Sequence, residues 1–181
     1  MQDLKQKALS EYQKAVIEQP ENAIAWTNLG NIYSKIGEKE KAIESYKQAI
    51  EINNNCSEAI NNLACIYLDN NENLDEALEL VNKAITLKPE EIWFYYDTLG
   101  WTYFKRKEYQ NAKKNVEQAI NVCQQDQEEF LSIAYYHLAL ICFESGNKSK
   151  ALEHYNKALK LSNDEILNSI INTNIKLIAG R

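Results

Sequence analysis

Four cysteines and two histidines are the residues of this chain that could bind a metal ion or form a disulfide. They are Cys56, Cys65, Cys123, Cys142, His137 and His154. A zinc site needs closely paired ligands, but the sequence has no C-x-x-C, and its histidines stand 17 residues apart. We therefore expect no metal and no cofactor. We interpret Cys142 as a small core residue and Cys65 as a residue on the inner face of its helix, and free thiols fit a reducing compartment.

The acidic and basic residues show no arrangement that is typical of catalysis. The sequence lacks a glycine-rich phosphate loop, an H-E-x-x-H motif and a G-x-S-x-G motif. Its carboxylates alternate with lysines, as in Glu38-Lys39-Glu40-Lys41, which is typical of a solvated helix face. We therefore expect that the protein is not an enzyme.

The overall charge argues against nucleic acid as a partner. The net charge is −6, and lysines and arginines are interleaved with acids instead of forming one basic surface. The densest basic run, Lys105-Arg106-Lys107, falls at a predicted turn, where the dipole of the preceding helix favours positive charge. We expect no nucleic-acid partner.

A pair of alanines seven residues apart recurs along the chain, and it indicates the helices that carry the cysteines, histidines and charged residues described above. The pairs are Ala8/Ala15, Ala42/Ala49, Ala77/Ala84, Ala112/Ala119 and Ala151/Ala158. Their first members are separated by 34, 35, 35 and 39 residues. Small residues at helical spacing predict close contact between helices, and a period near 34 predicts the same helix pair built repeatedly.

A second pattern, of a leucine followed by glycine or alanine, runs in the same register. Its members are Leu29-Gly30, Leu63-Ala64, Leu99-Gly100 and Leu138-Ala139. Each member begins thirteen or fourteen residues before an alanine pair, which is the length of one helix and a tight turn. The turns contain helix breakers such as Gly37 and Gly146. The pattern therefore predicts pairs of antiparallel helices.

These residues resemble the tetratricopeptide repeat (TPR) family. One repeat carries eight matching residues: Trp26, Leu29, Gly30, Tyr33, Gly37, Ala42, Tyr46 and Ala49. It departs from the family pattern at the final proline, where Asn54 stands, and the resemblance covers about residues 1 to 163. The resemblance implies an all-α fold, a right-handed superhelical solenoid of antiparallel helix pairs.

We expect one TPR domain over residues 1–181. A lone helix of the second type is predicted at 2–19, because no leucine pattern precedes Ala8. The predicted helix pairs are 23–54, 57–89, 92–124 and 128–162. A last amphipathic helix at 164–178, rich in isoleucine, is predicted to cover the end of the stack.

In TPR folds the first helix of each pair lines a concave groove, and the resemblance implies which residues lie there. The first half of the groove is polar and includes Asn28, Asn31 and Asn62, whose amides can pair with a peptide backbone. The second half is aromatic. Its predicted partner-binding residues are Phe94, Trp101, Phe104, Tyr136, His137 and Phe143. The open alternative is that the last helix or neighbouring helices bury several of these rings.

The resemblance also allows one specific TPR function to be tested. Chaperone-binding members hold a C-terminal carboxylate with two asparagines and several basic residues. Asn31 and Asn62 match the asparagines. The three basic positions instead hold Thr27, Phe94 and Thr98, so we do not expect a carboxylate clamp.

We therefore expect a protein-interaction scaffold that binds a peptide or a partner helix in its groove. The alternatives are a structural protein that self-assembles through its terminal helices as a homo-oligomer, and the docking arm of a larger protein. No stretch is apolar enough to span a membrane, and the N-terminus has no signal-peptide pattern, so we expect a cytoplasmic location. A chain that opens on half a repeat also fits a fragment. The repeat style favours a bacterial source.

Overall fold

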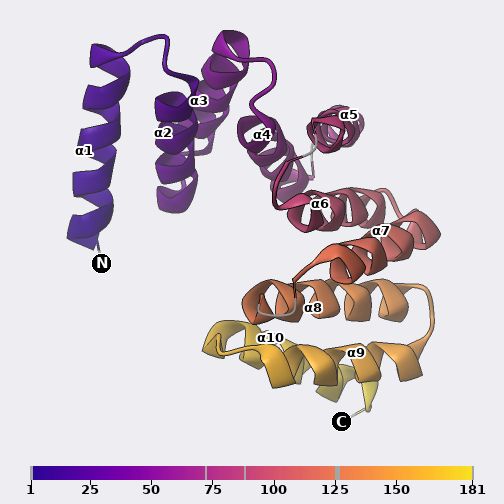
Figure 1. Cartoon of the computed structure of the whole chain (residues 1–181). Coiled ribbons are helices and arrows are strands. Elements are labelled where there is room, and N and C mark those ends of the chain that lie inside the picture. Colours follow the sequence, from indigo (N-terminus) through magenta and orange to yellow (C-terminus); the bar gives the residue numbers. More distant parts are fainter. Residues whose placement is uncertain (1, 72, 88, 125–126, 181) are drawn as a thin grey trace. The chain divides into compact units, whose positions relative to one another are not determined.

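The computed structural model describes residues 2–71, 73–87, 89–124 and 127–180, with side chains from residue 5 onward, and all regular structure within these ranges is helical (Figure 1). The helices are Gln2–Glu18 (α1), Ala23–Ile36 (α2), Lys39–Ile52 (α3), Ser57–Asn70 (α4), Leu74–Thr86 (α5), Ile92–Lys105 (α6), Tyr109–Val122 (α7), Glu128–Glu144 (α8), Lys148–Leu161 (α9) and Glu165–Ile178 (α10). The predicted all-α fold class is confirmed.

The helices gather into two compact units, residues 1–89 and residues 90–181. In the first unit α2 pairs with α3 and α4 with α5, while α1 packs on α2. In the second unit α6 pairs with α7 and α8 with α9, while α10 packs on α9. The assignment of residues 1–181 to one domain stays a prediction.

The alanine pattern marks the contact between the two helices of each pair. Both alanines of the pairs in α3, α5, α7 and α9 are fully buried. The partner helix must carry a small residue at the position that faces this contact. A Cβ added to Gly30 would lie 2.5 Å from the Tyr46 ring, and a Cβ added to Gly100 would lie 2.4 Å from Val116. Glycine at these two positions therefore permits the close packing of the helices.

Side-chain caps define the beginnings of α2 and α10, two helices that carry candidate functional residues. The side-chain oxygen of Asn22, Oδ1, accepts hydrogen bonds from the backbone N–H groups of Ile24 and Ala25, both at 3.1 Å. The Asp164 carboxylate does the same for Ile166 and Leu167, at 2.8 and 3.2 Å. Such caps satisfy amides that have no partner within the helix.

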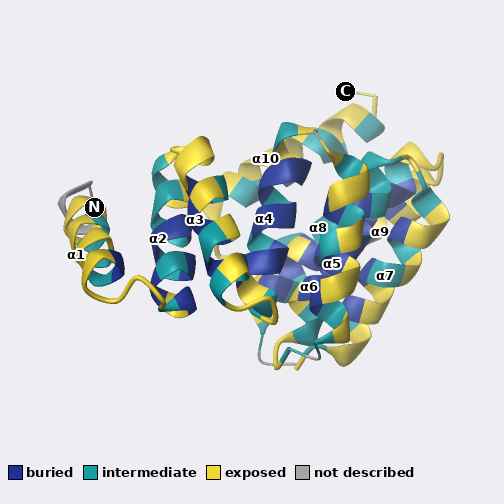
Figure 2. Ribbon diagram, turned by 90° about the horizontal axis from the view of Figure 1, so that it is seen from above, coloured by how far each residue is buried: buried dark blue, intermediate teal, exposed yellow. Residues whose placement is uncertain are grey.

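The first and last helices are less covered than the paired ones (Figure 2). Ala8, Tyr12 and Ala15 of α1 are only half-buried, although the corresponding residues of the paired helices are buried. In α10 Ile171 is fully buried, and Leu167, Ile175 and Ile178 pack against its cluster. The described part of the chain contains no helix with the length and apolar character needed to span a bilayer.

Candidate functional site

An asparagine network joins α2 to α4 in the first unit. The Asn31 side-chain oxygen accepts two hydrogen bonds, one from the Tyr46 hydroxyl and one from the Asn62 amide, each at 2.8 Å. The Asn31 amide donates to the Glu58 carboxylate at 3.0 Å. We call Asn31, Tyr46, Glu58 and Asn62 the amide cluster. Since the helices of two successive pairs contribute to it, the cluster connects one repeat to the next.

The amide cluster leaves little capacity for a partner at Asn31. Both acceptor positions of its oxygen are used, and one of its two amide hydrogens is used. Burial, with smaller effects from Cys65 and Glu58, raises the pKa of Tyr46 well above its usual value, so its hydroxyl stays a donor. Within the described residues the Asn28 side chain has no hydrogen bond, and Asn62 keeps its oxygen. Of the three predicted asparagines, Asn28 and Asn62 thus keep the most unused hydrogen-bonding groups within the described residues.

Three rings stack on one another in the second unit. The Trp101 ring lies 4.7 Å from the Phe104 ring and 4.4 Å from the His137 ring, with interplanar angles of 17° and 23°. The Lys105 ammonium lies 5.5 Å from the Trp101 ring centre. We call Trp101, Phe104 and His137 the ring cluster. All three rings are half-buried, so part of each remains accessible.

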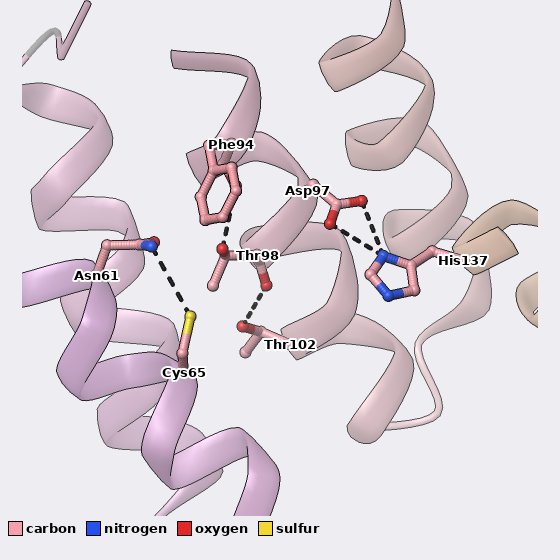
Figure 3. A network of polar contacts seen from close by, with 7 residues as sticks. All are labelled: Asn61, Cys65, Phe94, Asp97, Thr98, Thr102 and His137. Carbon is pink, nitrogen blue, oxygen red and sulfur yellow. Dashed lines mark hydrogen bonds and ion pairs between the residues drawn. The ribbon is translucent and has the colours of Figure 1, made fainter. Parts of the chain in front are cut away.

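A buried carboxylate holds the histidine of the ring cluster in place. Both Asp97 oxygens lie within hydrogen-bond distance of His137 Nδ1, at 3.0 and 2.9 Å. The Asp97 side chain is 11% exposed and the His137 side chain 16%. Figure 3 shows the second ring nitrogen directed away from Asp97. This nitrogen, Nε2, reaches solvent and has no partner among the described residues.

The Asp97–His137 pair determines what His137 can offer a partner. Because Nδ1 donates its proton to Asp97, neutral His137 presents Nε2 as an acceptor, and protonated His137 presents it as a donor. Two threonines of α6, the helix that carries Asp97, donate hydrogen bonds to backbone carbonyls of α6. Thr98 donates to the Phe94 carbonyl at 3.0 Å, and Thr102 donates to the Thr98 carbonyl at 2.8 Å (Figure 3). The acceptor of the His137 proton is therefore Asp97.

The other predicted aromatic residues lie outside the stack of the ring cluster, although the Tyr136 ring lies 5.9 Å from the His137 ring, at an interplanar angle of 44°. Tyr136 and Phe143 pack against a buried cluster of α8, α9 and α10 residues that contains Ile171. Burial raises the pKa of Tyr136, and burial raises the pKa of its neighbour Tyr155 to about 12. Phe94 is 48% exposed and touches Phe130, with ring centres 6.0 Å apart. The predicted aromatic half of the groove thus divides into open, stacked and covered parts.

Three participants, Tyr46, Glu58 and Asp97, were not among the residues selected from the sequence. Tyr46 carries the packing pattern of the repeat, which conceals its hydrogen bond to a residue 15 positions earlier. Asp97 stands 40 residues before His137, and no local motif connects them. A signal existed for the two acids, because each occupies a predicted groove position that holds no acid in the other repeats.

The described residues contain no group of three or more histidine, cysteine or acidic side chains that could hold a metal ion. All four cysteines are free thiols. Cys142 is buried, and this burial raises the pKa of its thiol, so it remains protonated and unreactive at neutral pH.

Comparison with known proteins places the chain among repeat proteins. It is 33% identical over 149 residues to a TPR repeat-containing protein of Methanocaldococcus jannaschii, covering 80% of this chain and 24% of that protein. It is 27% identical over 161 residues to the BBSome complex member BBS4 homolog of Drosophila melanogaster, covering 88% of this chain and 33% of that protein. The chain therefore spans about a quarter to a third of the length of these relatives.

A solved structure shares the fold. The crystal structure of PilW, a widely conserved type IV pilus biogenesis factor, matches with a TM-score of 0.83, covering 97% of this chain and 79% of PilW at 18% identity. Family models described as tetratricopeptide repeat match residues 23–56, 57–91 and 92–164. Because these matches adjoin one another over most of the sequence, the predicted family is confirmed, and the chain belongs to the tetratricopeptide repeat family.

Proposed function

We propose that this protein is an interaction scaffold that binds a peptide or helical segment of a protein partner on the first helices of its repeats. TPR repeats are typical of protein–protein interaction, which supports the general role. The specific proposal is that the ring cluster is the principal contact, with Asn28 and Asn62 as hydrogen-bonding positions in the first unit.

The observation that carries this proposal is the Asp97–His137 pair beside the stacked rings. A purely structural contact between α6 and α8 needs only apolar side chains. Here a buried carboxylate instead orients a histidine whose second nitrogen stays accessible. Fixing a polar group beside exposed ring area is what a recognition site requires, because the ordering has occurred before the partner arrives.

The expected mode of binding follows from these groups. An apolar side chain of the partner packs on the accessible parts of Trp101 and Phe104, and full burial of such a side chain contributes about 1.5–3 kcal/mol. Nε2 of His137 forms one directed hydrogen bond to the backbone of the partner. Asn28 and Asn62 pair with peptide backbone independently of its side chains.

The test is a comparison of two variants in affinity capture, followed by titration with the captured protein. Trp101→Ala combined with Phe104→Ala removes the ring area and should abolish capture, while the helix content by circular dichroism is kept. Gln118→Ala, at an exposed position of α7, is the matched control and should behave as wild type. Equal affinity of the double variant and wild type would contradict the proposal.

Self-assembly is a second candidate, favoured by apolar residues on the two terminal helices. Ile17 of α1 is 79% exposed, and Ile166 and Leu177 of α10 are 75% and 69% exposed. Exposed apolar patches often mark association sites. Sedimentation over a concentration series tests this candidate, and a monomer at every concentration would exclude it.

The remaining expectations concern the whole protein. One proposal is that the chain is the docking arm of a larger protein. It is supported by the comparison with the curated relatives, because the chain spans only about a quarter to a third of their length. The bacterial source and the cytoplasmic location stay predictions. So do the absence of enzymatic activity and the absence of a nucleic-acid partner.

A further inference from the structure

A hollow of about 550 Å³ lies between the beginning of α8 and the beginning of α10, at residues that the ring cluster does not use. Its lining includes Glu129 and Ile133 from α8, and Asp164, Ile166 and Ile170 from the cap and first turns of α10. The volume is within the range of cavities that bind ligands or partner side chains. All of these residues belong to the second unit.

The isoleucines that line the hollow are exposed, although α10 also has an apolar face that is covered. Ile166 is 75% exposed, Ile170 44% and Ile133 37%. Ile171 of the same helix is fully buried against α9, so α10 has two apolar sides and only one is covered. Ile166 and Ile170 are one helical turn apart, about 6 Å along the axis. They therefore form a short apolar ridge that a second helix can pack against.

The charges around the hollow identify the kind of partner. The lining residues fall within two longer segments, residues 128–135 and 158–170, which contain four carboxylates, at Glu128, Glu129, Asp164 and Glu165. The same segments contain one basic residue, Lys160. All four acids are exposed, and Glu129 and Asp164 belong to the lining itself. An apolar floor edged by acids is complementary to a helix with an apolar stripe flanked by lysine or arginine.

We propose that this hollow, which we call the α8–α10 hollow, is a docking site for a basic amphipathic helix of a protein partner. The apolar side chains of the helix, at i, i+3 or i+4 and i+7, fill the hollow over Ile133, Ile166 and Ile170. Its flanking lysines or arginines face Glu129 and Asp164. This site is independent of the ring cluster, so either proposal can fail without the other.

The test uses three synthetic peptides of about 18 residues, which as helices are about 27 Å long. The first contains leucine and lysine with leucines at helical spacing, and the second has the same composition with the leucines scattered. The third has the helical spacing but glutamate in place of lysine. Titration should show binding by the first peptide, which weakens as salt is raised from about 50 to about 300 mM, because salt screens the acidic rim. Equal binding by the second or third peptide would overturn the proposal.

Two sets of variants locate the binding. Ile166→Ser combined with Ile170→Ser should weaken the leucine–lysine peptide at least about tenfold, because two apolar contacts are lost. Leu177→Ser, which is also exposed on the same helix but lies outside the hollow, is the control and should change nothing. Glu129→Gln combined with Asp164→Asn should weaken binding a few fold and flatten its salt dependence. Asparagine at 164 still caps α10, so the fold is kept.

The same variants separate a helix partner from a second copy of this chain. Three results together would show that the occupant is another copy of this chain and that the proposal is wrong. These are self-association of the wild type, a monomeric Ile166→Ser/Ile170→Ser variant, and no binding of the leucine–lysine peptide. Unchanged peptide affinity in that variant would also overturn it. Circular dichroism of each variant shows that loss of binding does not come from unfolding.

Discussion

The two units build the accessible faces of their first helices from different chemistry on the same repeat frame. In residues 1–89 the polar side chains bond to one another, with Asn31 linked to Tyr46, Asn62 and Glu58. In residues 90–181 a hydrogen-bonded pair, Asp97–His137, supports a stack of rings that is only half-buried.

The difference indicates how each unit divides stability and recognition. A network that satisfies its own donors and acceptors has little hydrogen-bonding capacity left, and its contribution is to hold two repeats together. Stacked rings have no such requirement, so they keep apolar area for a partner. The first unit is therefore expected to depend on its polar residues for folding, and the second on its rings for binding.

The largest expected effect is on the amide cluster. Asn31→Ala should lower the free energy of unfolding by about 2–3 kcal/mol, because the buried Tyr46 hydroxyl and the Asn62 amide lose their acceptor. Asn28→Ala, on the same helix, should cost less than about 0.5 kcal/mol. Denaturant unfolding measures both variants. A similar cost for the two would show that the amide cluster does not stabilise the first unit.

A smaller effect separates the helix contacts of the two units. Gly100→Ala should cost about 1–2 kcal/mol, because the added methyl meets Val116 Cγ2 at 2.4 Å and backbone atoms of α7 at 3.0 Å. Gly30→Ala should cost less, because its three nearest atoms all belong to the Tyr46 side chain and none to the backbone. Thermal unfolding of both variants tests the order. A reversed order would mean that Tyr46 is held more firmly by Asn31 than the α7 backbone is by its own packing.

The smallest expected effect is a dependence of stability on pH. A contribution from histidine to this dependence is expected in the second unit only. Burial lowers the pKa of His154, and its Nδ1 atom is buried without a partner. The unfolded chain then binds the proton more readily than the folded chain, so stability is full above about pH 6.5 and falls as pH decreases toward the lowered folded value. Residues 1–89 contain no histidine.

Hydrogen exchange at pH 7 and at pH 5.5, resolved by segment, measures this difference. Protection should fall more in α8 and α9 than in α2 to α4. His154→Phe removes the titrating group and should remove most of the difference, while Tyr135, which stacks on His154 at 6.0 Å, keeps an aromatic neighbour. An equal loss of protection in both units at low pH would contradict the assignment to His154.

The helices and their pairing follow from local pattern and could be predicted. Ala42, Tyr46 and Ala49 predict one face of α3, and their burial to 2% exposure or less agrees with a contact between helices. Such a face depends on spacing within about two turns, which the sequence displays directly. Whether Tyr136 and Phe143 are covered could not be predicted, because it depends on how the last helices pack on their neighbours, and in the structure both pack against the cluster that contains Ile171.

The candidate site could be predicted only in part. Trp101, Phe104 and His137 were selected one by one from groove positions, but their stacking depends on rotamers that the sequence does not display. Asn31 was predicted as a residue that holds a peptide backbone. In the structure it holds Tyr46 and Asn62 instead, and any role toward a peptide stays a prediction.

The repeat, its period, the helix pairs and the family could be predicted from the sequence, because they depend on residue size and spacing along one chain. Which polar groups satisfy one another could be seen only once the helices were packed together. Asn31 with Tyr46 and Asp97 with His137 are partners from different helices, 15 and 40 residues apart. A buried donor takes whichever acceptor packing places within about 3 Å, and that choice is made in space.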